Sequence, residues 1–249
     1  MFEIDCRGLN FKAVNREIKK AAERGEKHLR LLNVNGQRYI CGGLKGEVKV
    51  EIHGFPGNDL GIFMDGPMVE VYGNAGDGVG NTMNSGHIIV HGDVGDVVGY
   101  SMRGGRIYVR GNAGYRLGIH LKEYGEKKPI IVVGGEVGDF LGEYMAGGVV
   151  VVLRLESDGA IESRFIAAGI HGGRIFVRGR IDENRLGFGA AVSDLSEEDY
   201  GLLEELVRDF CRVMKCSSRG VSSEEFVKII PVSKRPFEKL YHQTSIKVP

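Results

Sequence analysis

Residues 73–91 read GNAGDGVGNTMNSGHIIVH, and the next nineteen, residues 92–110, read GDVGDVVGYSMRGGRIYVR. The two stretches agree in the positions of most glycines and in a closing run of apolar residues. A repeat of this length is typical of a structure built from stacked copies of one small unit. Seven consecutive rows can be written, longer only in the fifth and seventh: 35–53, 54–72, 73–91, 92–110, 111–134, 135–153 and 154–178.

Glycine accounts for 39 of the 249 residues and recurs in columns of these rows. Because glycine adopts positive φ without a steric penalty, each column is predicted to mark a sharp bend of the chain. The columns stand at the first, fourth and eighth positions of a row: Gly54, Gly73, Gly92, Gly111 and Gly135; Gly57, Gly76, Gly95, Gly114 and Gly138; Gly61, Gly80, Gly99, Gly118 and Gly142.

Apolar residues repeat at the same spacing. Val71, Val90 and Val109 share one column, and a second β-branched column stands two positions before it. A spacing of two places both columns on one face of a strand, and stacked rows bury that face in a continuous core. We therefore predict an all-β solenoid with helical N- and C-terminal caps. Because nineteen is not a multiple of the six-residue repeat of left-handed acyltransferase helices, we expect a right-handed parallel β-helix of about seven rungs.

The two ends carry helical patterns. Asn10 can cap a helix that runs to about Arg24, and Ser196-Glu197-Glu198-Asp199 resembles a capping box that opens a helix to about Lys215. A short helix is expected after Ser222 or Ser223, followed by an extended tail. These patterns predict an N-terminal helical cap over 1–34, the β-helix over 35–180, and a C-terminal cap and tail over 181–249. The tail 231–249 is alternatively an arm that reaches another subunit.

The overall composition narrows the classes of function. Lysine plus arginine equals aspartate plus glutamate at 33 each, which argues against nucleic acid or a membrane surface as a partner. No signal peptide or run of eighteen apolar residues is found, so we expect a soluble cytoplasmic protein. No two cysteines form a C-x-x-C pair, which argues against zinc or iron–sulfur ligation. The cysteines are Cys6, Cys41, Cys211 and Cys216.

Several stretches resemble binding motifs in isolation. The glycine-rich residues 76–80 (GDGVG) resemble part of a dinucleotide-binding loop, and residues 111–118 (GNAGYRLG) resemble a phosphate-binding loop. No helix follows either stretch, although a dinucleotide-binding fold requires one. A column of acidic and amide residues suggests calcium ligands, but turn hydrogen bonding explains it better. That column reads Asn58, Asp77, Asp96, Tyr115 and Asp139.

Catalytic groups are also not evident. Ser85 and Ser101 lack the G-x-S-x-G context of a hydrolase, and no carboxylate or cysteine accompanies His87 and His91 as a metal ligand. Cys6 lies too far from the N-terminus to act as an N-terminal nucleophile. We therefore assign no catalytic, cofactor-binding or metal-binding residue and expect no cofactor.

Basic residues gather in the outward columns of the strands. They form either a solvated strand face or a stripe that docks an acidic partner surface. The candidate docking stripe consists of His87, His91, Arg106, Arg110, Arg174 and Arg178.

The rows G-x-x-G-x-x-x-G followed by G-G-x-I-x-V-x-G resemble the GXGXG domain that ends the large subunit of glutamate synthase, in a stand-alone archaeal-type form. Residues 138–153, which contain EYMAGGVVVVL, are especially similar. The resemblance implies a right-handed β-helix without catalytic residues, within an enzyme that converts glutamine and 2-oxoglutarate into two glutamates. It also implies partner subunits that carry the flavin barrel and the amidotransferase. Self-association of the chain into a homo-oligomer remains possible.

Two alternatives remain. Rows 73–121 also resemble the component of formylmethanofuran dehydrogenase that has the same glycine rows, within a tungsten or molybdenum complex. A stand-alone β-helix hydrolase would need outward carboxylates clustered on one face, whereas the outward columns are mostly basic or apolar.

Overall fold

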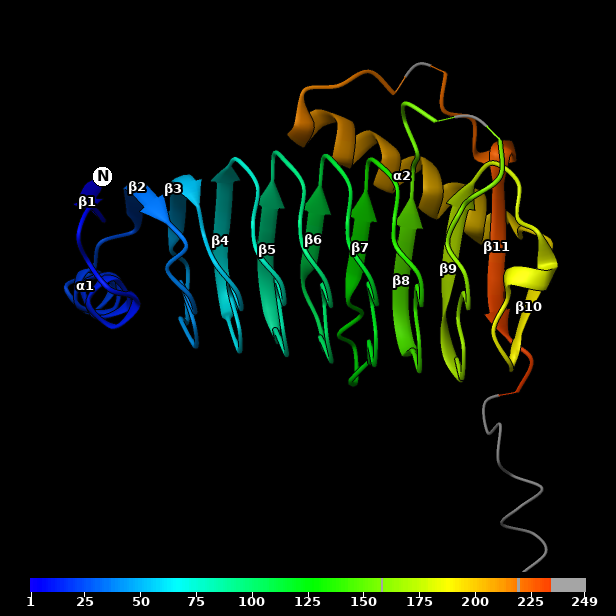
Figure 1. The fold of residues 1–249 in the computed structure, drawn as a ribbon, viewed down its shortest axis with the longest axis horizontal. Coiled ribbons are helices and arrows are strands. Elements are labelled where there is room, and N and C mark those ends of the chain that lie inside the picture. Colours follow the sequence, from blue (N-terminus) through cyan, green and yellow to red (C-terminus); the bar gives the residue numbers. More distant parts are fainter. Residues whose placement is uncertain (158, 219, 234–249) are drawn as a thin grey trace, which may run out of the picture.

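A computed structural model describes residues 1–157, 159–218 and 220–233. Its strands form a sheet in the order β1-β2-β3-β4-β5-β6-β7-β8-β9-β11-β10 (Figure 1). Strands β1 to β9 are parallel, and β11 and β10 continue the sheet in antiparallel pairing. The strands are β1 (Phe2–Asp5), β2 (His28–Asn35), β3 (Lys49–Phe55), β4 (Asp65–Tyr72), β5 (Ser85–Val90), β6 (Arg106–Val109), β7 (Ile130–Val133), β8 (Ala146–Val152), β9 (Gly172–Arg178), β10 (Ala190–Ser193) and β11 (Phe226–Pro231).

The repeat sets the register of the strands. Val71 pairs with Val90, Val90 with Val109 and Val109 with Val133, as the column predicts. Each of the seven rows ends in one of the strands β3 to β9, and these seven strands are joined by six coils. The prediction of a parallel β-solenoid is therefore confirmed.

The core lies inside the coils. Both β-branched strand columns are fully buried, and so are two further inward columns, which carry mainly leucine, valine and methionine. Examples of the last two are Leu60, Val79, Val98 and Leu141, and Met64, Met83, Met102 and Met145.

Glycine is required in these columns for two different physical reasons, whereas the sequence suggested only sharp bends. Gly99, at the eighth position, has φ of +69°, as predicted for a bend. Gly95, at the fourth position, has no positive φ, and an added Cβ would lie 2.0 Å from Oδ1 of Asp77 in the preceding coil. The fourth-position column is therefore glycine because successive coils approach too closely for a side chain.

The column of acidic and amide residues explains this close approach. Asp77 Oδ1 accepts a hydrogen bond from the backbone N–H of Asp96 at 3.0 Å, and Asp96 Oδ1 accepts one from Tyr115 at 2.8 Å. A second ladder links Asn74, Asp93 and Asn112 in the same way. These hydrogen bonds join one coil to the next, and do not close turns within a coil as we expected.

The N-terminal residues extend the sheet as well as supplying a helix. Helix α1 (Phe11–Glu23) begins after Asn10, whose side chain accepts a hydrogen bond from the backbone N–H of Ala13. The helix connects β1 to β2 and lies at the N-terminal end of the solenoid (Figure 1). Strands β1 and β2 were not anticipated, because they lie outside the glycine rows.

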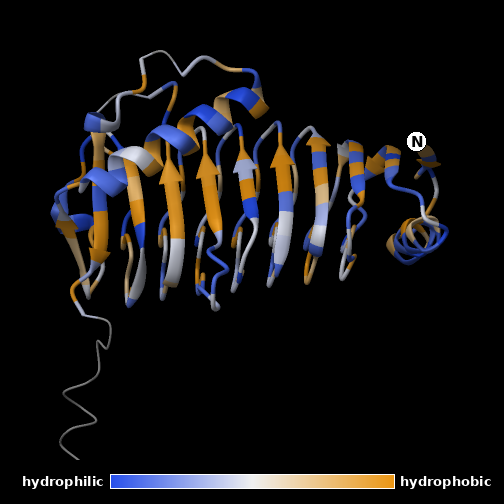
Figure 2. Cartoon of the chain, turned by 180° about the vertical axis from the view of Figure 1, so that it is seen from behind, coloured by the Kyte–Doolittle hydropathy of each residue, from blue (hydrophilic) through white to orange (hydrophobic). Residues whose placement is uncertain are grey.

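The C-terminal helix lies where the sequence did not place it. Helix α2 (Glu197–Met214) begins with the predicted capping box of Ser196 and Asp199. It packs on the outer face of the sheet instead of covering the last coil, as Figure 2 shows from behind. Strand β11 pairs with the edge of β9 instead, and β10 pairs with β11. The short helix η1 (Glu183–Arg185) lies between β9 and β10 in the chain, and η2 (Ser223–Glu225) lies between α2 and β11. Residues 234–249, most of the expected arm, are outside the described part.

Candidate docking surface

The residues of the docking stripe lie on the outer face of the sheet, but in two groups. His87 and Arg106 are paired in register on β5 and β6, and Arg174 and Arg178 lie on β9. Apolar residues of β7 and β8 separate the groups, because Ile130 follows Arg106 in the column. The stripe is therefore not continuous.

Helix α2 covers the apolar part of this face. Leu203, Leu206 and Phe210 of the helix are fully buried against outward side chains of the strands. These strands are apolar on both faces, as is usual for a parallel sheet that is covered on both sides. The strand residues of the apolar cluster formed with α2 are Ile89, Tyr108, Val132, Val149, Val151, Phe176 and Phe226.

Arg106 and Tyr108 bind the same carboxylate of α2. The Tyr108 hydroxyl donates to Asp209 Oδ2 at 2.7 Å, and Arg106 Nη1 donates to the same oxygen at 3.3 Å. Burial and the adjacent Asp209 raise the pKa of Tyr108, so its hydroxyl stays a donor. One arginine of the stripe is therefore paired within the chain.

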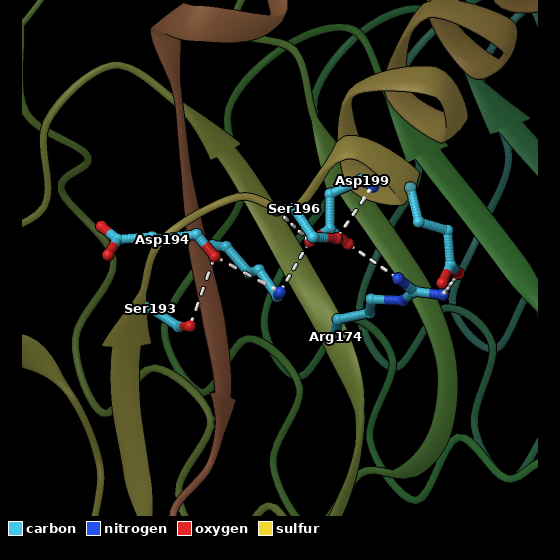
Figure 3. A network of polar contacts seen from close by, with 7 residues as sticks. Arg174, Ser193, Asp194, Ser196 and Asp199 are labelled. Atoms are coloured by element: carbon cyan, nitrogen blue, oxygen red, sulfur yellow. Dashed lines mark hydrogen bonds and ion pairs between the residues drawn. The ribbon is translucent and has the colours of Figure 1, made fainter.

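Arg174 is paired at the other end of the helix, around a fully buried Asp199 (Figure 3). Asp199 accepts hydrogen bonds from Arg174 Nη1 at 2.7 Å, Lys228 Nζ at 2.6 Å and the backbone N–H of Ser196 at 2.9 Å. Burial alone would raise the pKa of Asp199, but these donors outweigh it and hold the pKa well below its usual range. The carboxylate thus joins α2, β9 and β11.

Arg178 contacts the segment that follows α2. Its guanidinium is paired with Glu225 of η2, and its Nη2 donates to the carbonyl oxygen of Gly220 at 3.1 Å. Three of the four arginines in the docking stripe therefore bind acidic groups of the C-terminal segment. Docking of an external partner on this stripe stays a prediction.

The other three stripe residues differ in their surroundings. His91 Nε2 lies 3.0 Å from Glu70 Oε1, and its ring stacks on Tyr72. Arg110 is exposed and forms no ion pair with a described residue; it lines a groove of about 780 Å³. His87 contacts the Tyr108 ring edge-on at 4.7 Å, and its Nε2 is buried without a hydrogen-bond partner in the described part. Burial lowers the pKa of His87 to about 4.

A charged network occupies the part of the sheet beside α2. Glu51 is 8 % exposed and contacts His28, Arg30 and Lys49. Lys49 bridges to Glu70, which links the network to the next strand. Burial opposes ionisation of Glu51, but the hydrogen bonds from Lys49, His28 and Arg30 lower its pKa to about 2. The carboxylates of Glu51 and Glu70 are therefore paired with basic side chains of the same network.

A second exposed surface lies at the turns that precede the strands, and the sequence analysis did not identify it. Phe140 and Phe165 stack with ring centroids 5.0 Å apart, and Arg116 lies over Phe140 at 4.5 Å. Tyr144 stacks on His120 in the same coils at 5.3 Å. The rings come from two different positions of the repeat, so no single column of the sequence indicated them.

No three His, Cys, Asp or Glu side chains in the described residues are grouped in a way that could hold a metal ion. None of the helices in this part of the chain has the length and apolar character to cross a membrane.

The fold defines a parallel β-solenoid whose coils are punctuated by glycine and joined by side-chain ladders. The GXGXG motif family matches residues 28–231, and the chain therefore belongs to that family. This confirms the resemblance to the GXGXG domain, and the match extends beyond the rows to include β2 and β11. The chain is also 42 % identical over 248 residues to the uncharacterized protein MJ1350 of Methanocaldococcus jannaschii, covering 96 % of this chain and 95 % of that protein.

Proposed function

We propose that this chain is a non-catalytic structural subunit of a multi-subunit glutamate synthase. It binds a flavin-bearing synthase chain and an amidotransferase chain, which together make glutamate from glutamine and 2-oxoglutarate. The assembly is cytoplasmic, and this subunit holds no cofactor of its own. The observation that carries the proposal is the family match over 28–231, which spans nearly the whole solenoid and its C-terminal strands.

The architecture fits a structural role. Each coil is fixed to the next by parallel strand pairing on one side and by the carboxylate and amide ladders on another. Helix α2 adds a third layer across strands that are far apart in the sequence. A rod held in three ways deforms little, and a rigid body of this kind positions partner surfaces at fixed separations.

Reconstitution tests the proposal directly. The full chain is co-expressed with the synthase and amidotransferase chains of its host, and the mixture is analysed by size-exclusion chromatography with light scattering. We expect a stoichiometric complex whose glutamine-dependent glutamate synthesis exceeds that of the two partner chains without this subunit. If the chain elutes alone at micromolar concentration and synthesis is unchanged by its addition, the proposal is wrong. A stable complex with a tungsten or molybdenum enzyme instead would support the formylmethanofuran dehydrogenase alternative.

A further inference from the structure

We propose that the flavin-bearing synthase chain docks on a patch of aromatic and arginine side chains at the turns before the strands, and not on the basic stripe of the sheet. This inference rests on the proposed function. The patch, called here the corner patch, consists of Tyr100, Arg116, Phe140, Tyr144, Arg164 and Phe165.

Large aromatic side chains are exposed here although they add nothing to the core. The exposed fraction is 39 % for Tyr100, 46 % for Tyr144 and 52 % for Phe165. Their rings stack from coil to coil, with interplanar angles of 12° for Phe140 and Phe165 and 13° for His120 and Tyr144. Stacking fixes the rings before any partner binds, so little side-chain entropy is lost in docking.

The backbone shows that these residues are placed against local preference. Phe140, Tyr144 and Phe165 have φ of 64°, 52° and 56°, a region that disfavours bulky side chains. Glycine occupies the corresponding position of other coils, since Gly78 aligns with Phe140 and Gly169 aligns with Tyr144. Other residue types adopt positive φ at the same positions, since Val97 aligns with Phe140 and has φ of 53°, and Thr82 aligns with Tyr144 and has φ of 52°. The coil geometry therefore sets the backbone, and the fold does not require an aromatic residue at either position.

The charges of the corner patch indicate the chemistry of the partner. Arg164 Nη2 lies 2.7 Å from Asp139 Oδ2, with side chains 67 % and 13 % exposed. Arg116 Nε lies 3.1 Å from Glu143 Oε2, with side chains 44 % and 14 % exposed. In both pairs the guanidinium faces solvent and the carboxylate lies beneath it. The patch therefore fits a protein surface with an apolar centre and carboxylates at its rim.

The sheet face is less suited to this role. Arg106 and Arg174 are paired with Asp209 and Asp199 of α2, so a partner there would have to displace the helix. Tyrosine, phenylalanine and arginine exposed together have instead the composition of the residues that contribute most to protein–protein affinity.

Binding constants of variants test the inference. The full chain is titrated with the purified synthase chain by isothermal calorimetry. In the variant Tyr144→Asn/Phe165→Asn, asparagine tolerates the positive φ, so folding is retained and the melting temperature is unchanged or higher. We expect the dissociation constant to rise at least tenfold. Arg116→Gln/Arg164→Gln should weaken binding and reduce its dependence on salt.

Phe63→Asn is the matched control. Phe63 occupies the position of Tyr144 in an earlier coil, has φ of 56° and is 54 % exposed, but lies outside the corner patch. Its replacement should change the dissociation constant less than twofold, as should Arg110→Gln on the sheet face.

If the wild type binds and only Arg110→Gln weakens the complex, the docking site is wrong but the proposed function stands. If Phe63→Asn weakens binding as much as the patch variant, the location in the later coils is wrong. If the wild type does not bind at about 100 µM, far above the dissociation constants of stable subunit contacts, the proposed function fails.

Discussion

The hydroxyl of Tyr108 on β6 donates a hydrogen bond to Oδ2 of Asp209 on α2, although the two residues are 101 positions apart in the sequence. Tyr108 is fully buried, and its ring also contacts Phe210 of the helix at 5.6 Å between centroids. One side chain thus supplies both an apolar and a polar contact between the solenoid and its C-terminal helix.

Removing this hydroxyl should loosen the helix. We expect Tyr108→Phe to lower the free energy of unfolding by about 1.5 kcal/mol, because a hydrogen bond to a charged acceptor is lost while Asp209 keeps its contacts with Arg106 and Arg212. Urea denaturation followed by circular dichroism measures the change. Tyr124→Phe is the control, because Tyr124 is 71 % exposed, and its effect should stay within about 0.5 kcal/mol. Equal effects of the two variants would contradict this account.

Asp199 is the most deeply buried carboxylate among the described residues. Asp199→Asn removes the charge that Arg174 and Lys228 share, and breaking a buried pair in this way costs about 3 kcal/mol. Glu198→Gln affects the same arginine from a side chain that is 75 % exposed, so its effect should be much smaller than that of Asp199→Asn. Thermal and urea unfolding of both variants decide the point. A loss below about 1 kcal/mol for Asp199→Asn would show that the network does not hold the helix.

Two glycine-to-alanine substitutions should have opposite effects. In Gly95→Ala the new Cβ would meet Asp77 Oδ1 at 2.0 Å, and relieving the overlap breaks the ladder, so we expect a loss of about 2 kcal/mol. Gly201 lies on the exposed side of α2 with nothing near its missing side chain. Gly201→Ala should therefore stabilise the protein by about 0.8 kcal/mol through helix propensity. Melting temperatures that shift in the same direction would refute this distinction.

His87 makes stability depend on pH. Burial holds its folded pKa at about 4, whereas the unfolded value is near the ordinary 6.5. The unfolded chain therefore binds the proton first, and stability falls as pH drops from about 6.5 towards 4. Between pH 7.5 and 5.0 this one group should account for a loss of about 2 kcal/mol. The charged groups Asp209, Arg106, Arg212 and Glu70 act on His87 in the folded state.

The variant His87→Leu isolates this contribution. It removes the titrating group, so the difference between its unfolding free energies at the two pH values should be smaller than in the wild type by the same amount. An unchanged difference would mean that the pKa of His87 in the folded protein is close to its unfolded value. The depressed pKa values of Glu51 and Asp209 do not interfere, because their effects on stability appear at lower pH.

The repeat made the solenoid predictable, because each column places the same side-chain type in the same environment. Val71, Val90 and Val109 are neighbours in the register that their spacing predicts. The helix ends were also local signals, since Asn10 and Ser196 cap the residues that follow them. The first strands were missed because Leu29 and Leu31 are buried without accompanying glycine columns.

The position of α2 could not be read from its own residues. Its apolar stripe indicates that it packs on something, but the surface is chosen by contacts such as Tyr108 to Asp209 between distant segments. A signal was present in the strands, where Val132, Val151 and Phe176 face outward and would not be expected against water. The corner patch was hidden for another reason, because the positive φ of Phe140 and Tyr144 follows from the coil geometry and not from residue type.

The ladders of Asp77 and Asp96 have a geometric consequence. Asp77 and Asp96 each present an acceptor to a backbone N–H of the following coil, so a coil that carries aspartate at this position can be followed by another coil without a new kind of contact. The length of the rod can therefore change only in whole increments of about 4.8 Å, the distance between neighbouring strands. The number of coils encoded in the gene therefore sets the distance between the two ends of the solenoid.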